Sequence, residues 1–340
     1  MSKITVIVPT YNVEQYIRTC LDSLIKQTFK DFEVWVVNDG SPANEQAIAE
    51  EYAQKHPFIK AIKKENGGYG SVLQYSIENI TSEYCLICDP DDYLSPDALE
   101  VLYKEAITTN ADIIIGAKYF IYTDGGESTY DKSYNKTYVS LKINYAYEKG
   151  SKEFDDLFFV DPSPHSKLYR HSILTTIKFP TKISFTDNLL FYIALLKANK
   201  VSYVSNACSY YLIDREGNTS TDLKPRVLEQ HTIVFSEIIK QASNVTNVPD
   251  IFYYRMFEAF KFIFYTSRRI EAQKEVIEKE LINLYQVVEL LKPHKQAIMN
   301  YYYKYNKSGK NEQRKDKLIL SGCCSKFVYK RWIKQLVGER

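Results

Sequence analysis

The fold is decided by a stretch near the start of the chain, Ile4-Thr5-Val6-Ile7-Val8-Pro9-Thr10-Tyr11-Asn12. Its first five residues are mostly β-branched, which favours a short buried strand, and Pro9 ends that strand. From about residue 13 to 26, apolar residues recur at three- and four-residue spacing, which predicts a helix. The stretch therefore predicts a strand and a helix joined by a polar loop.

The alternation of strand and helix continues to about residue 120. Further strands are predicted at residues 33–37, 59–62, 84–88 and 111–118, with helices at 44–55, 69–79 and from about 96. Strands separated by single helices form right-handed crossovers. The pattern predicts an α/β fold with a Rossmann-like, mostly parallel sheet and helices on both faces.

The later part of the chain has a different pattern. Residues 120–160 are rich in Tyr, Gly and Lys and predict an excursion or a hairpin, and the pattern is helical from about residue 223. One helical stripe joins Phe252, Met256, Phe260 and Phe264 and is typical of a buried core face. We therefore expect a first domain over residues 1–220 and a helical C-terminal region over residues 221–340.

The net charge of +2 over 340 residues is an average of two unlike parts. Residues 301–340 carry 11 basic and 3 acidic residues, which leaves 33 basic and 39 acidic residues in the first 300. A helical pattern over residues 325–337 places Val328, Tyr329, Trp332, Ile333 and Leu336 on one side and Lys326, Lys330, Arg331 and Lys334 on the other. This suits an interfacial helix on an anionic membrane, or a terminal helix packed on its neighbours.

Composition excludes several classes of protein. With 45% hydrophobic and 25% charged residues, the sequence is typical of an ordinary folded protein. We expect no membrane span and no signal peptide, hence a cytoplasmic location or the inner face of the cell membrane. Nothing resembles a nucleic-acid recognition module, and the oligomeric state is left open.

Cys85 and Cys88 lie in a strand that would point them to opposite faces, which favours buried apolar packing over a zinc or redox pair.

Polar clusters follow three of the predicted strands, at residues 10–12, at Asp39 and at Asp89-Pro90-Asp91-Asp92. Ligands of parallel sheets bind beyond these strand ends. Three acids in four residues repel one another unless a cation or a proton offsets them, and they suit Mg²⁺ or Mn²⁺. The alternative is an acidic turn leading into a helix. Asp39 could accept hydrogen bonds from a nucleotide or simply form a turn.

Four motifs in order closely resemble the family 2 glycosyltransferases. They are Ile4-x-Val6-x-Val8-Pro9-x-Tyr11-Asn12, Val36-Val37-Asn38-Asp39-Gly40-Ser41, Asn66-Gly67-Gly68 and Asp89-x-Asp91-Asp92. The resemblance implies a GT-A fold and a nucleotide-diphospho-sugar donor, most often of uridine. It implies donor binding by Pro9, Thr10, Tyr11, Asp39, Asn66, Gly67, Asp89 and Arg215. It also implies an Mn²⁺ or Mg²⁺ ion held by Asp89 and Asp91 that bridges the diphosphate.

The resemblance extends to a general base. Family members place an Asp of a Glu-Asp pair at the start of a helix, and Asp187 is the matching residue, with Thr186 in place of Glu. A structural acid at a helix N-terminus is the alternative. His165, Lys167 and Tyr169 match a segment bordering the acceptor cleft, although Trp is common at the position of His165. Gln74 stands in a Val-Leu-Gln run where relatives often carry Ala-Arg-Asn.

Taken together, the resemblance implies an inverting enzyme that moves one hexose (galactose, glucose or an N-acetyl form) from a UDP-sugar to a glycan hydroxyl. The acceptor would belong to a surface glycoprotein or to a lipid-linked capsule or cell-wall oligosaccharide. Processive members of the family carry a Gln-x-x-Arg-Trp motif, but here Val328 stands where the Gln would precede Arg331-Trp332. This favours an enzyme that adds a single sugar over a processive polymer synthase. A sugar-phosphate nucleotidyltransferase and a non-catalytic partner of another transferase remain as alternatives.

Overall fold

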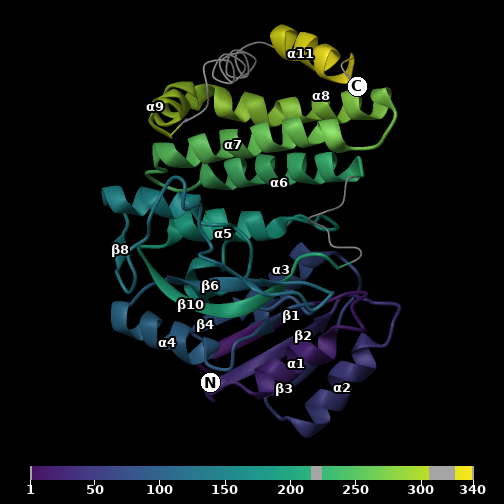
Figure 1. Ribbon diagram of the computed structural model, residues 1–340, viewed down its shortest axis with the longest axis vertical. Helices are drawn as coiled ribbons and strands as arrows, with labels where there is room; N and C mark the ends of the chain where they lie inside the picture. Colours follow the sequence, from purple (N-terminus) through teal and green to yellow (C-terminus); the bar gives the residue numbers. More distant parts are fainter. Residues whose placement is uncertain (1, 216–223, 306–325, 339–340) are drawn as a thin grey trace. The chain divides into compact units, whose positions relative to one another are not determined.

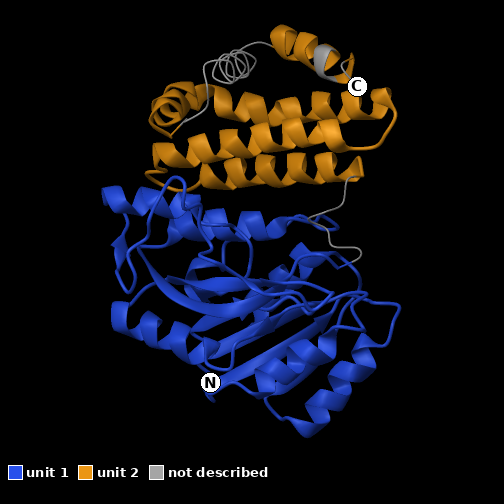
Figure 2. Cartoon of the chain, viewed as in Figure 1, with its two compact units in different colours: residues 1–218 blue, residues 219–340 orange. Residues whose placement is uncertain are grey.

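The computed structural model describes residues 2–215, 224–305 and 326–338. The chain divides into two compact units, residues 1–218 and 219–340 (Figure 2). The predicted boundary at residue 220 lies outside the described residues and stays a prediction. Among the described helices, none is both long enough and apolar enough to cross a membrane.

The described residues of unit 1 form a ten-stranded mixed sheet (Figure 1). Its strands are β1 (Ile4–Thr10), β2 (Phe32–Asn38), β3 (Ile59–Lys63), β4 (Tyr84–Ile87), β5 (Tyr93–Leu94), β6 (Ile113–Ile121), β7 (Thr129–Asp131), β8 (Tyr147–Glu148), β9 (Lys167–Arg170) and β10 (Lys200–Leu212). The main order is β3-β2-β1-β4-β9-β6-β10-β5, with β7 on β6 and β8 on β10. Strands β1 to β4 are mutually parallel, as are β6 and β10.

The antiparallel strand β9 separates the two parallel groups. It pairs with β4 on one side and β6 on the other. The sequence does not predict this strand, because its four residues carry no alternation that distinguishes them from a loop. Its position matters because it brings residues 165–169 beside the end of β4. The antiparallel pairing of β7 with β6 confirms the hairpin expected after residue 120.

The helices of unit 1 cover both faces of the sheet, as predicted (Figure 1). They are α1 (Ile17–Ile25), α2 (Glu45–Lys55), α3 (Tyr69–Asn79), α4 (Ala98–Thr109) and α5 (Thr186–Lys197), with 3-10 helices at Lys152–Phe159 and His171–Ile173. Apolar residues of α1, α2 and α4 share one buried cluster with alternate residues of β1, such as Val6 and Val8. Helices α3 and α5 lie against each other on the opposite face.

The cysteine pair behaves as the strand pattern predicts. Cys85 and Cys88 are both buried and free. Cys88 belongs to the cluster beneath α1, where its sulfur lies 3.6 Å from that of Cys20, whereas Cys85 is not part of that cluster. Burial raises the pKa of Cys85 to about 12, so the thiolate needed for metal or redox chemistry is disfavoured.

Unit 2 is helical in its described residues. It contains α6 (Arg226–Ala242), α7 (Asp250–Thr266), α8 (Lys274–Leu291), α9 (Lys295–Tyr305) and α11 (Lys326–Gly338), with 3-10 helices at Ser267–Arg269 and Lys292–His294. The predicted stripe lies on α7, where Phe252, Met256, Phe260 and Phe264 are all buried. This confirms that the stripe is a core face.

Helix α11 packs its apolar side within unit 2. Tyr329 and Ile333 are each 1% exposed, and the Tyr329 hydroxyl donates a 2.6 Å hydrogen bond to the Leu281 carbonyl of α8. Trp332 lies 4.9 Å from Phe264 between ring centroids. Val328, predicted on the same side, is exposed instead. The apolar side therefore packs on neighbouring helices, while the basic side, Lys326, Lys330, Arg331 and Lys334, faces solvent.

Candidate active site

Asp92 joins the ends of two strands that are distant in the sequence. Its Oδ1 accepts a 2.8 Å hydrogen bond from the Leu212 amide at the end of β10. Its Oδ2 lies 2.7 Å from His165 Nε2. Burial and the charge of Asp91 raise the pKa of Asp92 well above its usual value. Asp92 belongs to the acidic segment predicted to suit a cation, but the ligand pair implied by the resemblance was Asp89 and Asp91 without it.

Asp89 lies at the same end of β4. The hydroxyl of Tyr69, the first residue of α3, donates a 3.0 Å hydrogen bond to Asp89 Oδ1. Burial, followed by the charges of Asp92 and Asp91, raises the pKa of Asp89 well above its usual value. A divalent cation would relieve this repulsion, so the donor set fits the metal that the resemblance implies.

One group of described side chains is close enough to share an ion. Ligand atoms of Asp89, Asp92 and His165 all lie within 4.8 Å of one another. Asp91, predicted with Asp89 as a ligand, instead pairs with the guanidinium of Arg215. Arg215 also lies over the Tyr16 ring, 5.7 Å from its centroid. The structure thus brings Arg215 to the acidic segment from 124 residues away.

Asp187 lies in the first turn of α5, at a helix start as the resemblance implied. Asn188 Nδ2 donates a 3.3 Å hydrogen bond to Asp187 Oδ1. Burial raises the pKa of Asp187 to about 6. Its charge in turn contributes to raising the pKa values of Tyr69 and Asp89. The predicted base and the acidic segment therefore interact electrostatically, although 98 residues separate Asp187 from Asp89.

Asp39 holds the glycine turn that follows β3. Its carboxylate accepts hydrogen bonds from the amides of Gly67 (3.0 Å) and Gly68 (2.7 Å) and from Lys64 Nζ (2.7 Å). Asn66 Nδ2 donates to the Asp39 carbonyl at 2.9 Å. The predicted residues of these two motifs are thus brought together. Lys64 carries no motif signal and was not predicted.

The loop after β1 lies beside this turn. The amide of Asp39 donates a 2.9 Å hydrogen bond to the Thr10 carbonyl. The Thr10 hydroxyl donates to the Val8 carbonyl at 3.0 Å, and Thr10 is 1% exposed. Pro9 is the β1 partner of Val37 in the sheet. Tyr11 is 51% exposed, so its ring face is open to a ligand.

Replacing Gly68 with Ala should destabilise unit 1 and distort the turn held by Asp39. Gly68 has φ 82° and ψ 169°, a backbone region that is essentially restricted to glycine. An added Cβ would lie 2.9 Å from Lys182 Cα. We expect a loss of at least about 2 kcal/mol in the free energy of unfolding, measured by urea denaturation.

Gly125→Ala is the matched control for this prediction. Gly125 also has a positive φ of 73°, but its added Cβ would meet nothing within 4 Å. The control should lose about 1 kcal/mol from backbone strain alone. Equal losses in the two variants would show that the contact with residue 182 is unimportant.

The predicted acceptor residues His165, Lys167 and Tyr169 form, with Lys118, a group of buried polar side chains, here called the buried polar wall. The His165 ring stacks on Tyr211 with centroids 4.0 Å apart. Burial, followed by the charge of Lys118, keeps the pKa of His165 well below its usual value, so the imidazole is neutral. Lys167 and Tyr169 are fully buried. Burial lowers the pKa of Lys167 to about 7, and its Nζ donates to the Ser163 carbonyl at 2.6 Å.

Lys118 is a second buried cation in this wall and was not predicted. Its Nζ pairs with the Asp161 carboxylate and lies 3.1 Å from the Ser163 hydroxyl. No motif surrounds Lys118 in the sequence, so only its partner from 43 residues away reveals its place. Lys118, Lys167 and Tyr169 are fully buried, so they support this wall without being exposed at its surface.

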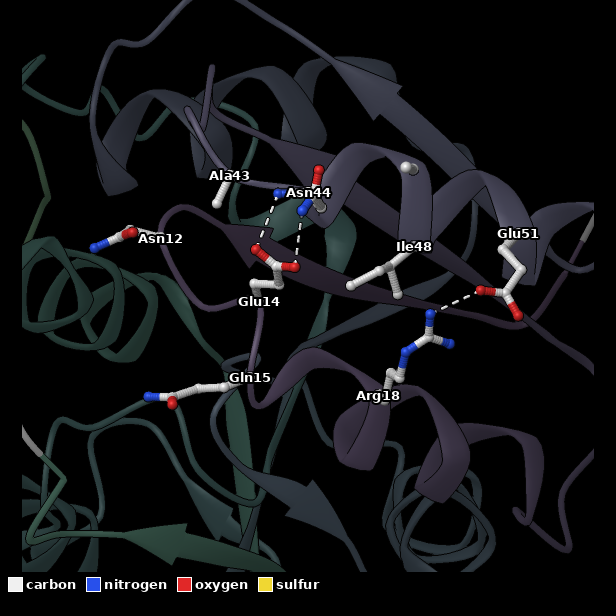
Figure 3. A pocket seen from close by; sticks show the side chains of 9 residues that line it. Asn12, Glu14, Gln15, Arg18, Ala43, Asn44, Ile48 and Glu51 are labelled. Atoms are coloured by element: carbon white, nitrogen blue, oxygen red, sulfur yellow. Dashed lines mark hydrogen bonds and ion pairs between the residues drawn. The ribbon is translucent and has the colours of Figure 1, made fainter.

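A hollow of about 820 Å³ opens between helices α1 and α2 (Figure 3). Glu14 accepts a 2.9 Å hydrogen bond from Asn44 Nδ2, and Arg18 pairs with Glu51 at 2.8 Å. Its lining residues include none of the predicted catalytic, metal or donor residues. The hollow is therefore distinct from the acidic site at the strand ends.

Comparisons with known proteins agree with this geometry. A family model described as Glycosyl transferase family 2 matches residues 5–177. Glycosyltransferase GlyA of Streptococcus pneumoniae serotype 4 is 34% identical over 226 residues, which cover 64% of this chain and 31% of GlyA. The uncharacterized glycosyltransferase MG025 homolog of Mycoplasma pneumoniae is 32% identical over 64% of this chain and 70% of its own length.

A third relative and a solved structure extend the comparison. The poly(ribitol-phosphate) beta-glucosyltransferase of Bacillus spizizenii is 31% identical over 63% of this chain and 33% of its own length. The chain thus spans about a third of GlyA and of this enzyme. The crystal structure of S. aureus TarS 1-349 in complex with UDP-GlcNAc matches with a TM-score of 0.73. It is 23% identical and covers 98% of this chain and 90% of the TarS chain, which shows a common GT-A fold. This chain is a glycosyltransferase and belongs to glycosyl transferase family 2.

Proposed function

We propose that the chain is an inverting enzyme that moves a single hexose from a UDP-sugar to a hydroxyl of a glycan acceptor. One observation carries this proposal: burial raises the pKa of Asp187 to about 6, and the charge of Asp187 acts on Asp89 at the end of β4. A base with a pKa near neutrality is suited to take a proton from a hydroxyl. Asp89 and Asp91 supply the charge needed to hold a cation beside the leaving group.

In the proposed reaction, the Asp187 carboxylate accepts the proton of the acceptor hydroxyl. The hydroxyl oxygen forms a bond to the anomeric carbon while the bond from that carbon to the diphosphate breaks, and the diphosphate leaves with the electron pair. A bound Mn²⁺ or Mg²⁺ would stabilise the charge on the leaving diphosphate. Arg215, now paired with Asp91, is placed to bind the same phosphates because a guanidinium favours phosphate oxygens.

The nucleoside site is proposed at Asp39 and the loop after β1. The exposed ring of Tyr11 offers a face for the base. The remaining sides of the proposed nucleoside site come from Pro9, Thr10, Asn66 and Gly67. The TarS fold with UDP-GlcNAc bound supports a uridine donor. The hexose is glucose, galactose or an N-acetyl form, and the beta-glucosyltransferase of Bacillus spizizenii supports a hexose.

We place the acceptor on a cell-surface polymer assembled in the cytoplasm or at the inner face of the membrane. The name of the Bacillus spizizenii relative supports a poly(ribitol-phosphate) acceptor, and a lipid-linked oligosaccharide or a glycoprotein glycan has the same hydroxyl chemistry. The exposed basic side of α11 supports contact with anionic lipids. His165, Lys167 and Tyr169 form the wall on the acceptor side.

A donor panel tests the proposed function. The full chain is incubated with Mn²⁺ and, separately, with UDP-glucose, UDP-galactose, their N-acetyl forms and a GDP-sugar, and release of the nucleotide is measured. We expect slow, metal-dependent UDP release from one UDP-sugar and none from the GDP-sugar. Nucleotide and metal binding without release from any donor would contradict the proposal.

The pH profile of transfer should follow the ionisation of Asp187. Burial raises its pKa to about 6, and only the ionised form accepts a proton. Activity should therefore fall about tenfold per pH unit below pH 6 and level off above it. The charged and titratable groups nearby are Asp161, Lys167, Asp89, Tyr69 and Tyr169. The test is to measure kcat/KM against pH at saturating metal, with donor binding measured in parallel. A flat profile from pH 5 to 8 would contradict the role of Asp187.

A further inference from the structure

His165 and Asp92 are in contact, which the sequence of the acidic segment does not predict. The two residues are 73 positions apart, yet His165 Nε2 lies 2.7 Å from Asp92 Oδ2. A ligand atom of Asp89 completes the group within 4.8 Å. Two donors bound side by side on one octahedral ion at about 2.1 Å stand about 3 Å apart. The pair is now joined at hydrogen-bond distance, and a shift of a few tenths of an ångström would give it the spacing of two ligands of one cation.

The charges around this group differ from those around Asp91. Asp91 pairs with Arg215, a cation of the protein itself. Asp89 contacts the Tyr69 phenol, and Asp92 contacts a backbone amide and the His165 imidazole. The charges of Arg215 and Lys118 also lower the pKa of Asp92, but burial and Asp91 outweigh them. A cation bound between half-buried Asp89 and buried Asp92 would offset their mutual repulsion.

His165 also retains an unused nitrogen. It is 5% exposed, and its Nδ1 has no hydrogen-bond partner among the described residues. A buried polar atom without a partner is costly, although the Tyr169 hydroxyl is also without one among the described residues. His171, the other histidine of this region, instead places its Nε2 2.8 Å from the Ile77 carbonyl. His165 is thus a neutral imidazole whose Nε2 meets Asp92, and Nε2 is the nitrogen that would bind the ion.

We propose that His165 and Asp92 join Asp89 as ligands of the divalent cation, and that the imidazole nitrogen makes the site select Mn²⁺ over Mg²⁺. The inference rests on the proposed metal-assisted transfer. A nitrogen donor raises affinity for transition metals, whereas Mg²⁺ prefers oxygen ligands and keeps its water. The alternative is a hydrogen-bonded His–Asp pair that binds no metal.

The test measures ligation directly. Metal-free full-length protein is loaded with Mn²⁺, and electron spin echo envelope modulation detects any nitrogen bound to the ion. Dissociation constants for Mn²⁺ and Mg²⁺ are measured by calorimetry on the wild type, on His165→Gln and on the control His171→Gln. Melting temperatures confirm that each variant is folded.

We expect a ligand-nitrogen signal in the wild type and in His171→Gln and none in His165→Gln. His165→Gln should weaken Mn²⁺ binding about tenfold or more, and Mg²⁺ binding by less than about threefold. Bound Mn²⁺ with oxygen ligands alone in the wild type would overturn the proposal, even if His165→Gln did not fold. A nitrogen signal that persists in His165→Gln would overturn it as well.

The donor panel separates this inference from the proposed function. Metal-dependent UDP release by a wild type without a ligand nitrogen would leave the transfer reaction standing and overturn the role of His165. A nitrogen-ligated Mn²⁺ without release from any donor would support the ligand set and contradict the transfer reaction.

Discussion

Asp187→Asn should lower the kcat of sugar transfer by about 10²- to 10⁴-fold, the usual contribution of a general base. An amide has nearly the shape of the carboxylate and can still accept the hydrogen bond from Asn188, but it cannot take a proton. Binding of UDP and of Mn²⁺ should change little, because the proposed donor contacts come from other elements. Single-turnover kinetics with the donor identified by the panel would measure the loss.

Asp124→Asn is the control for this result. Asp124 is an exposed acid of unit 1, and its Oδ1 accepts a hydrogen bond from the Gly126 amide that Asn can also accept. The control should retain wild-type kcat. Near wild-type transfer by folded Asp187→Asn would remove Asp187 from the reaction and leave it as a helix-start residue.

Asp89→Asn should reduce transfer by about 10²- to 10⁴-fold, since a metal ion supplies several kcal/mol to a developing anion. Asp89 belongs to both the ligand set implied by the sequence and the group observed in the structure. The Asn side chain keeps an acceptor for the Tyr69 hydroxyl and loses the charge. A metal titration of kcat/KM should show a raised Mn²⁺ requirement with partial recovery at high Mn²⁺.

Asp97→Asn is the matched control, because Asp97 is an exposed acid a few residues further on and accepts its hydrogen bond from the Ser95 hydroxyl. It should show the wild-type metal requirement. If Asp89→Asn transferred sugar normally at low Mn²⁺, a metal role for the acidic segment would be ruled out.

The basic C-terminal region illustrates a limit of periodicity. The pattern over residues 325–337 predicts an amphipathic helix, and α11 confirms one over the described residues. Periodicity cannot say what the apolar side meets, because a membrane and a neighbouring helix exclude water equally well. Tyr329 and its hydrogen bond to Leu281 show that α8 covers this side. Contact with lipid would then rely on the charges of the exposed side.

Much of the site could be predicted because its parts are local. The strand ends at residues 10–12, at Asp39 and at Asp89–Asp92 follow from β-branched runs stopped by polar residues, and Asp187 follows from the family resemblance. These signals lie within a few positions of one another. A parallel sheet then gathers its strand ends at one edge, so their meeting also follows from the sequence.

The sequence by itself determined the alternating α/β order and, through its resemblance to family 2, the GT-A fold and the acids and base proposed for the site. The tertiary structure alone decided that β9 enters between β4 and β6, which brings His165 to Asp92. It also decided that Arg215 pairs with Asp91, that Lys64 pairs with Asp39 and that Lys118 is buried beside Asp161. The physical reason is that local elements follow from periodicity over neighbouring residues. The pairing of these charged side chains instead depends on which segments, distant in the sequence, pack against one another in the folded chain.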